Sequence, residues 1–366
     1  MDNAKSSDRR QWLVRRGLGP ETIERVLVAL GRPLPERCPD PQSVSFPNEA
    51  FVPDWIETAV EADRLGSVAA LQHRVVELNF PIAPEIRSTP DYHRACLDPD
   101  VQLGDWPRHP VEGGPAWAAP DRLRVFLHDT GAGLIPVVEA PNRGDFLILL
   151  RALGHRNEPV AIPDSMGANF LNGYVNRRRF IAVRDAHAAG RIDQHPPDPA
   201  LWKDRLLVLT EGPYSGVPGE AVGFSDAEWL ARSRTLRLHH ESCHYFVRRL
   251  FPHLVFGLQD ELVADFAGLV AATGRFRARD FLVFMGLEAF PRYRPGGRFE
   301  NYQRPFRDHP DVVTAIQHLL VDAAHHLESA SPQWPADDHR QGNLDVLATL
   351  THLPLEALAD PSTRLL

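Results

Sequence analysis

The residues best suited to chemistry lie in one short segment, L-H-H-E-S-C-H-Y at residues 238–245. His240, Glu241 and His244 form the pattern H-E-x-x-H. On a helix, side chains four residues apart lie one turn apart on the same face, so both imidazoles can reach a single zinc ion. Glu241 lies beside this pair, where its carboxylate can serve as a base for a water molecule without being a ligand. The segment therefore predicts a zinc site with its own base.

A long helix has to position these side chains. Residues 225–228, S-D-A-E, form a capping box, and residues 229–251 contain neither Gly nor Pro before Pro252. The pattern predicts a helix with the motif well inside it. His239 points about 100° away from His240 on such a helix, which places it outside the ligand set. Cys243 is a possible soft ligand, but a small packing residue is the preferred interpretation.

A second helix is predicted over residues 259–272, with Gly274 as its C-terminal stop. A catalytic zinc ion usually takes three protein ligands and one water, so two histidines need a third partner. Glu261, in the first turn of this second helix, can supply it. Asp265 follows one turn later, where it can accept the spare ring N–H of a ligand histidine and fix its tautomer.

These two segments, H-E-S-C-H at 240–244 and E-L-V-A-D at 261–265, resemble the H-E-x-x-H and E-x-x-x-D signature of the gluzincin zinc metallopeptidases, the thermolysin-like group. The resemblance implies roles for five residues: zinc ligation by His240, His244 and Glu261, general base catalysis by Glu241, and a supporting carboxylate at Asp265. It covers roughly 30 of 366 residues, so it implies little about the rest of the chain. The segment 240–245 also resembles the H-E-x-x-H-Y segment of an uncharacterised bacterial family.

The same resemblance carries expectations about the surrounding fold. It implies a zincin-like architecture in which a mixed sheet covers the active-site helix. Residues 206–210, L-L-V-L-T within the segment 204–215, are predicted to form a strand. That strand is similar in position to the substrate-binding edge strand of the gluzincins.

Several polar side chains near the motif are candidates for substrate contacts. The turn before the long helix offers an aromatic hydroxyl, and a loop rich in Arg, Tyr, Pro and Gly at residues 292–302 could bind a carboxylate or polarise a carbonyl. A histidine further on could stabilise a transition state. These candidates are Tyr214, Arg294, Arg298, Tyr302 and His325.

Composition narrows the class of protein. A hydrophobic content of 43% is that of a globular protein, and a net charge of −8 argues against a general nucleic-acid binder. No segment looks membrane-spanning, and the N-terminal residues are polar and basic and contain no apolar signal core. The three cysteines, Cys38, Cys96 and Cys243, are few and widely spaced, which favours a reducing cytoplasm over a disulfide framework.

The expected fold class is α+β, mostly helical with a small mixed sheet. Two short helices are predicted within residues 7–30, and strands at residues 123–127 and 134–138. Residues 163–168 and 172–173 are rich in turn residues. We expect a boundary near residue 120, with a helical and irregular region at 1–120 and a zincin-like metal-binding catalytic domain at 121–366.

Four hypotheses for function follow from these patterns. The first is a zinc-dependent hydrolase that cleaves a peptide or small amide-containing substrate. The second is a metal-dependent tailoring enzyme of small-molecule metabolism, acting on a non-peptide substrate with the same ligands. The third is a non-catalytic binding protein that a metal stabilises, and the fourth is an intracellular toxin-like protease. Metal binding and the effect of Glu241→Gln on turnover discriminate between catalytic and non-catalytic roles.

Overall fold

A computed structural model describes residues 2–31, 34–107, 109–192, 197–303, 306–331 and 340–365. The chain forms two compact units. One unit is discontinuous in sequence and comprises residues 1–46 and 213–366, and the other comprises residues 47–212. We call them the helical unit and the sheet unit. The predicted boundary near residue 120 lies inside the sheet unit, so the compact units divide the chain differently from the predicted domains.

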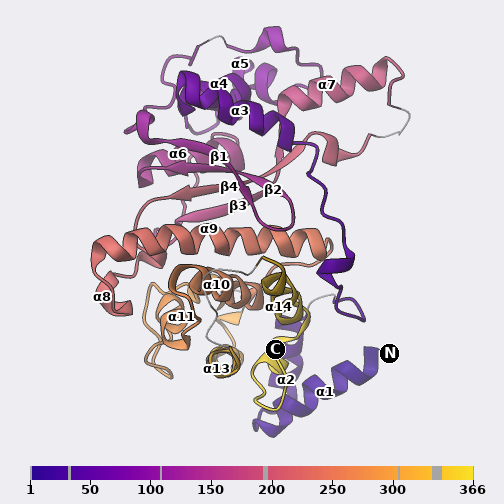
Figure 1. Ribbon diagram of the computed structural model, residues 1–366, viewed down its shortest axis with the longest axis vertical. Coiled ribbons are helices and arrows are strands. Elements are labelled where there is room, and N and C mark those ends of the chain that lie inside the picture. The colour runs from indigo at the N-terminus through magenta and orange to yellow at the C-terminus, as the bar shows by residue number, and fades with distance from the viewer. Residues whose placement is uncertain are drawn as a thin grey trace. The chain divides into compact units, whose positions relative to one another are not determined.

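The sheet unit contains four strands in the order β1-β2-β4-β3 (Figure 1). β1 pairs antiparallel with β2, β2 parallel with β4, and β4 antiparallel with β3. The strands predicted at residues 123–127 and 134–138 are confirmed as β1 and β2. The strands are β1 (Arg124–Asp129), β2 (Leu134–Ala140), β3 (Ala168–Val175) and β4 (Lys203–Thr210).

Helices of the sheet unit pack on this sheet to form its core. Trp55 of α3 and Phe146 of α6 belong to one buried cluster with Val138 of β2 and Val208 of β4. Because Val138 and Val208 are register partners, both helices cover the same face of the sheet. The helices are α3 (Val52–Leu65), α4 (Ser67–Arg74), α5 (Pro90–Tyr92), α6 (Arg143–His155) and α7 (Arg177–Ala188).

Two predictions about the strands need correction. Residues 206–210 do form a strand, but β4 lies between β2 and β3, so it is not an edge strand. The turn-rich segment around Asn172 and Gly173 is mostly strand β3. Gly173 has a φ of 110° and lies at an irregularity in the β3–β4 pairing, so one glycine breaks the register without ending the strand.

The helical unit is built around α9 (Asp226–Leu250) and α10 (Leu258–Thr273), which confirm the two predicted helices. The Ser225 hydroxyl caps α9 by accepting the Glu228 N–H, and Gly274 ends α10 with a φ of 78°. The other helices are α1 (Asp2–Arg15), α2 (Pro20–Ala29), α8 (Gly219–Val222), α11 (Ala278–Met285), α12 (Glu300–Gln303), α13 (Pro310–Ala330), α14 (Arg340–His352) and α15 (Leu355–Leu358).

A glycine lets α9 and α10 approach closely. A Cβ added at Gly268 would lie 2.7 Å from the Leu236 carbonyl oxygen, well inside van der Waals contact. Only glycine fits this crossing without displacing a helix. The close approach fixes where the first two turns of α10 lie against the middle of α9.

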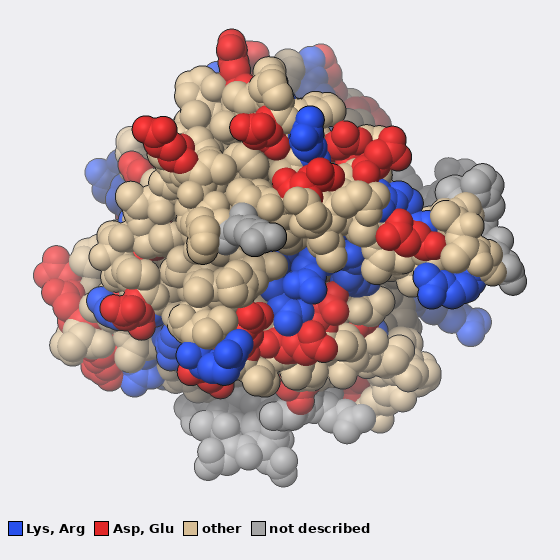
Figure 2. Space-filling model, turned by 90° about the horizontal axis from the view of Figure 1, so that it is seen from above, with Lys and Arg blue, Asp and Glu red and all other residues tan. Residues whose placement is uncertain are grey.

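The fold class is α+β, mainly helical with a small mixed sheet, as predicted. Within the described residues, no helix has the length and apolar character needed to cross a bilayer. On the face shown in Figure 2, acidic and basic side chains are interspersed.

Candidate metal centre

Three side chains from α9 and α10 place their donor atoms around one point. The Nε2 atoms of His240 and His244 are 3.2 Å apart. Glu261 places its two carboxylate oxygens 3.6 Å from these nitrogens, one oxygen facing each imidazole. Both histidines are buried, with 5% and 7% of their surface exposed. The two helices therefore bring together the three predicted ligands.

The spacing of these donors fits a tetrahedral metal. Ligand atoms 2.0–2.1 Å from zinc lie about 3.3–3.4 Å from one another at the corners of a tetrahedron. The 3.2 Å between the two nitrogens is close to that value, and each nitrogen lies 3.6 Å from one oxygen of Glu261, a different oxygen for each ring. Catalytic zinc sites take three protein ligands of this kind and leave the fourth position to water or substrate.

The electrostatics of the group also favour a cation. Burial by itself would lower the pKa of His244, but the hydrogen bond and charge of Glu261 raise it to about 9. Burial raises the pKa of Glu261, and the two imidazoles and Arg298 outweigh this and hold it well below its ordinary value. The Glu261 carboxylate thus stays ionised beside the two imidazoles. Its negative charge, which favours a proton on His244, also favours a divalent cation between the three side chains.

Asp265 orients the first histidine. Its Oδ1 lies 2.9 Å from His240 Nδ1. The side chain of Asp265 is completely buried, and an ionised carboxylate there accepts the Nδ1–H, which leaves the lone pair of Nε2 for the metal. Burial raises the pKa of Asp265, but Arg298 and the hydrogen bonds from His240 and Tyr214 hold it below its ordinary value.

Tyr214 and Arg298 complete this support and do not face outward as substrate contacts. The Tyr214 hydroxyl donates to Asp265 Oδ1 at 2.6 Å and lies 3.0 Å from His240 Nδ1. Arg298 donates to the Tyr214 hydroxyl at 2.6 Å and to Asp265 Oδ2. The two predicted substrate-binding residues therefore lie behind His240, where they fix Asp265.

Glu241 follows His240 on α9 and lies outside the donor set. It is 7% exposed, and its charge acts on His244. The predicted base is thus next to the donors without being one of them.

The other three predicted substrate-binding residues, Tyr302, Arg294 and His325, differ in whether they contact the donor residues. Tyr302 hydrogen-bonds to Glu261; burial and this contact both raise its pKa. Arg294 is bound instead to Glu288, at 2.5 Å, and to the Val283 carbonyl. His325 is exposed on α13, and no described contact joins it to the metal group. Only Tyr302 of these three reaches the site.

Three supporting residues were missed in the sequence. Ser233 accepts the Tyr214 N–H at 2.9 Å, and Arg237 donates to the Pro213 carbonyl at 2.8 Å, so both hold the Tyr214 turn. Phe256 packs on His244, with ring centroids 5.0 Å apart. Ser233 and Arg237 are seven and three residues before His240, on the same face of α9, and this helical spacing is a signal that could have identified them.

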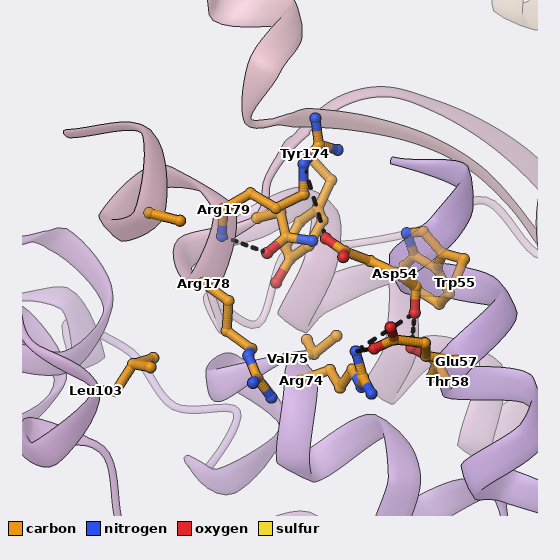
Figure 3. A pocket seen from close by; sticks show the side chains of 12 residues that line it. Asp54, Trp55, Glu57, Thr58, Arg74, Val75, Leu103, Tyr174, Arg178 and Arg179 are labelled. Atoms are coloured by element: carbon orange, nitrogen blue, oxygen red, sulfur yellow. Dashed lines mark hydrogen bonds and ion pairs between the residues drawn. The ribbon is translucent and has the colours of Figure 1, made fainter. Parts of the chain in front are cut away.

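The sheet unit has a separate cavity of about 240 Å³ (Figure 3). Its walls carry charges that largely pair with one another, because Arg74 binds Glu57 at 3.2 Å and the Arg179 guanidinium lies 3.7 Å from Asp54. Behind it, the buried Asp204 accepts hydrogen bonds from Trp55, Asn176 and Arg179. Its lining residues all belong to the sheet unit, whereas the three donors belong to the helical unit.

Fold and site together define an α+β protein with a buried group of two histidines and one glutamate, supported by an aspartate. The chain belongs to a family of unknown function (DUF7005), whose model matches residues 11–362. Searches of curated proteins and of solved structures returned no match.

Proposed function

We propose that this protein is a zinc-dependent hydrolase of a peptide or other amide bond, with chemistry similar to that of the gluzincins. The observation that carries the proposal is the group of His240, His244 and Glu261, whose two nitrogens lie 3.2 Å apart and each 3.6 Å from a carboxylate oxygen, with Glu241 next to them. A zinc ion held by His240, His244 and Glu261 would lower the pKa of a coordinated water towards about 7 and polarise a substrate carbonyl.

Glu241 is the base in this proposal. Its carboxylate takes a proton from the attacking water and later delivers it to the nitrogen of the leaving amine. Its position one residue from a ligand, outside the donor set, suits a group that moves a proton and does not bind the metal.

Tyr302 is the proposed donor to the substrate carbonyl oxygen as negative charge develops there. Its hydroxyl hydrogen-bonds to Glu261, so it lies at the edge of the donor group. Arg298, whose guanidinium lies 3.9 Å from Glu261 Oε2, instead positions Asp265 and Tyr214. A preorganised hydrogen-bond donor of this kind typically contributes 10²–10³-fold to turnover.

We also propose that the protein is cytoplasmic. The support is that Cys38, Cys96 and Cys243 are all free thiols, as expected in a reducing compartment.

The proposal is tested by comparing wild type with Glu241→Gln and His244→Ala. We expect about one zinc per chain in wild type and in Glu241→Gln, and little in His244→Ala, by elemental analysis. Cleavage of a peptide and acyl-amide library should fall at least about 10³-fold in Glu241→Gln, because the base is lost while the metal stays.

Either of two results contradicts the proposal. Absence of stoichiometric metal after zinc reconstitution removes the metal centre. Full zinc occupancy with no Glu241-dependent turnover of any amide leaves a metal-stabilised binding protein or an enzyme for a non-peptide substrate.

A further inference from the structure

A second cavity, of about 290 Å³, lies in the helical unit beside the metal group. Two of its lining residues touch metal donors directly: Phe256 packs on His244, and Tyr302 hydrogen-bonds to Glu261. The cavity therefore shares two walls with the donor group.

Its described lining is apolar. Among the residues that the structure describes, no Asp, Glu, Lys, Arg or His lines it, and most of its walls come from aliphatic and aromatic side chains such as Leu30, Ile316 and Phe299. Five charged side chains line the cavity of the sheet unit, by contrast. A charged group entering this cavity would lose its hydration and find no ionic partner among the described lining residues.

Of the few polar side chains in the described lining, Gln259 is engaged outside the cavity, Asn301 lies in solvent, and the Tyr302 hydroxyl is at the donor group, where the proposed function uses it. Gln259 uses its amide nitrogen to donate to the Leu350 carbonyl at 3.0 Å, and Tyr302 is bound to Glu261. Asn301 is exposed. Burial of apolar surface is therefore what this cavity offers a ligand.

We propose that this cavity binds an uncharged aliphatic or aromatic group of the substrate, next to the bond that is cleaved. This inference rests on the proposed zinc hydrolase function and adds the substrate class. The volume is roughly twice that of an engineered cavity of 150 Å³ that accepts benzene, so it holds a phenyl ring and the carbons that link it to the amide.

The experiment compares three hydroxamates that share one zinc-binding group. Acetohydroxamate has no tail, 3-phenylpropanohydroxamate has an apolar tail, and its 4-carboxyphenyl analogue has a charged tail. On the zinc-loaded protein, calorimetry should show the phenyl compound binding about tenfold or more tightly than the other two, because only its tail gains from burial.

A matched pair of variants locates the effect. Ala29→Phe adds a ring at a residue that lines the cavity, near the C-terminal end of α2. Val28→Phe adds the same ring one residue earlier, at a side chain that is 80% exposed and outside the lining. We expect Ala29→Phe to remove the phenyl advantage while acetohydroxamate binds as before, and Val28→Phe to behave like wild type.

The outcomes separate this inference from the proposed function. Equal affinities for all three hydroxamates in wild type overturn the inference and leave the zinc site standing. If the protein binds no zinc, the proposed function fails, and 3-phenylpropanamide, which needs no metal, still tests the cavity by ligand-observed NMR. Binding of that amide in Val28→Phe and its loss in Ala29→Phe support an apolar site, and equal signals in both variants overturn it.

Discussion

At the level of single residues, the group formed by His240, His244 and Glu261 depends on a carboxylate that is not one of its donors. Asp265 contacts His240 Nδ1 and also receives hydrogen bonds from Tyr214 and Arg298. These contacts fix the ring orientation of one ligand. Nothing comparable is found for His244 in the described part of the chain, where its Nδ1 is buried without a hydrogen-bond partner. The two histidines are therefore held by different means, one by a carboxylate and the other by packing on Phe256.

Asp265→Asn should weaken zinc binding by about 10–100-fold, because the amide lacks the charge that favours the Nδ1–H tautomer of His240. Competition with a fluorescent zinc chelator measures the change. Asp226→Asn, an exposed substitution on the first turn of α9, is the control and should keep wild-type affinity. Equal affinities in both variants would show that Asp265 has no part in metal binding.

At the level of secondary structure, the site exists because α9 and α10 cross closely. Gly268 is two turns beyond Glu261 on α10, and its missing side chain lets the Leu236 carbonyl come near. Any side chain at this position pushes the two helices apart. The distance between the histidines of one helix and the glutamate of the other depends on that contact.

Gly268→Ala should destabilise the helical unit by about 1–3 kcal/mol and reduce zinc affinity, because an extra methyl forces the helices to shift. Urea unfolding and zinc titration measure both effects. Gly104→Ala is the control, because a Cβ at Gly104 meets no atom within 4 Å. A Gly268→Ala protein with unchanged zinc affinity would contradict the link between the crossing and the site.

In the sheet unit, the buried Asp204 of β4 connects this strand to α3 and α7. It accepts hydrogen bonds from Trp55 of α3, from Asn176 at the N-cap of α7 and from Arg179 of α7. Burial raises its pKa to about 6, against the opposing effects of Asn176, Arg179 and Trp55. The unfolded value is about 3.9, so the folded chain binds this proton more tightly. The free energy of unfolding due to this group therefore falls as the pH rises from about 4 to about 6, and is constant above that.

We expect this decline to be on the order of 2 kcal/mol in wild type and absent in Asp204→Asn, which does not titrate. Urea unfolding between pH 4 and 7, followed by the fluorescence of Trp55 and its neighbours, measures it. Glu57→Gln removes an exposed carboxylate near the same cavity and should keep the wild-type pH dependence. The same slope in Asp204→Asn as in wild type would exclude Asp204 as its source.

Local signals predicted the helices of the metal site well. The Ser225 cap, the absence of Gly and Pro up to Pro252, and Gly274 are all encoded within a few residues of the helix ends, and H-E-x-x-H needs only helical spacing. The proximity of His240, His244 and Glu261 could therefore be predicted from the sequence.

Non-local contacts explain what was missed. Strand order depends on partners far apart in the chain, so the inner place of β4 and the identity of β3 could not be derived from residues 168–175 and 203–210 alone. The inward direction of Tyr214 and Arg298 likewise depends on Asp265, 51 and 33 residues away. The apolar cavity combines residues 29–31 with residues near 256, 302 and 316, which no single sequence pattern connects.

At the level of the whole molecule, all three candidate metal ligands belong to the helical unit. A ligand that binds only the folded state stabilises what it binds, by about 2.7 kcal/mol at 100 times its Kd. Zinc should therefore raise the unfolding temperature of one unit and leave the other unchanged.

Calorimetry should show this as a shift of one transition by about 5–10 °C on adding zinc, for a unit of roughly 200 residues. The transition of the sheet unit serves as an internal control, and chelator should reverse the shift. His244→Ala should show none. A zinc-dependent shift of both transitions by the same amount would contradict a site confined to the helical unit.

The division of the chain has a consequence during synthesis. The sheet unit is one continuous stretch, residues 47–212, inserted between the two parts of the helical unit. At about 5–20 residues per second, a ribosome takes about ten to thirty seconds to make that insert. Residues 1–46 are then already outside the exit tunnel, without the later helices that complete their unit. Translation therefore yields the sheet unit first, and His240, His244 and Glu261 are added to a nascent chain whose residues 1–46 were made before that unit.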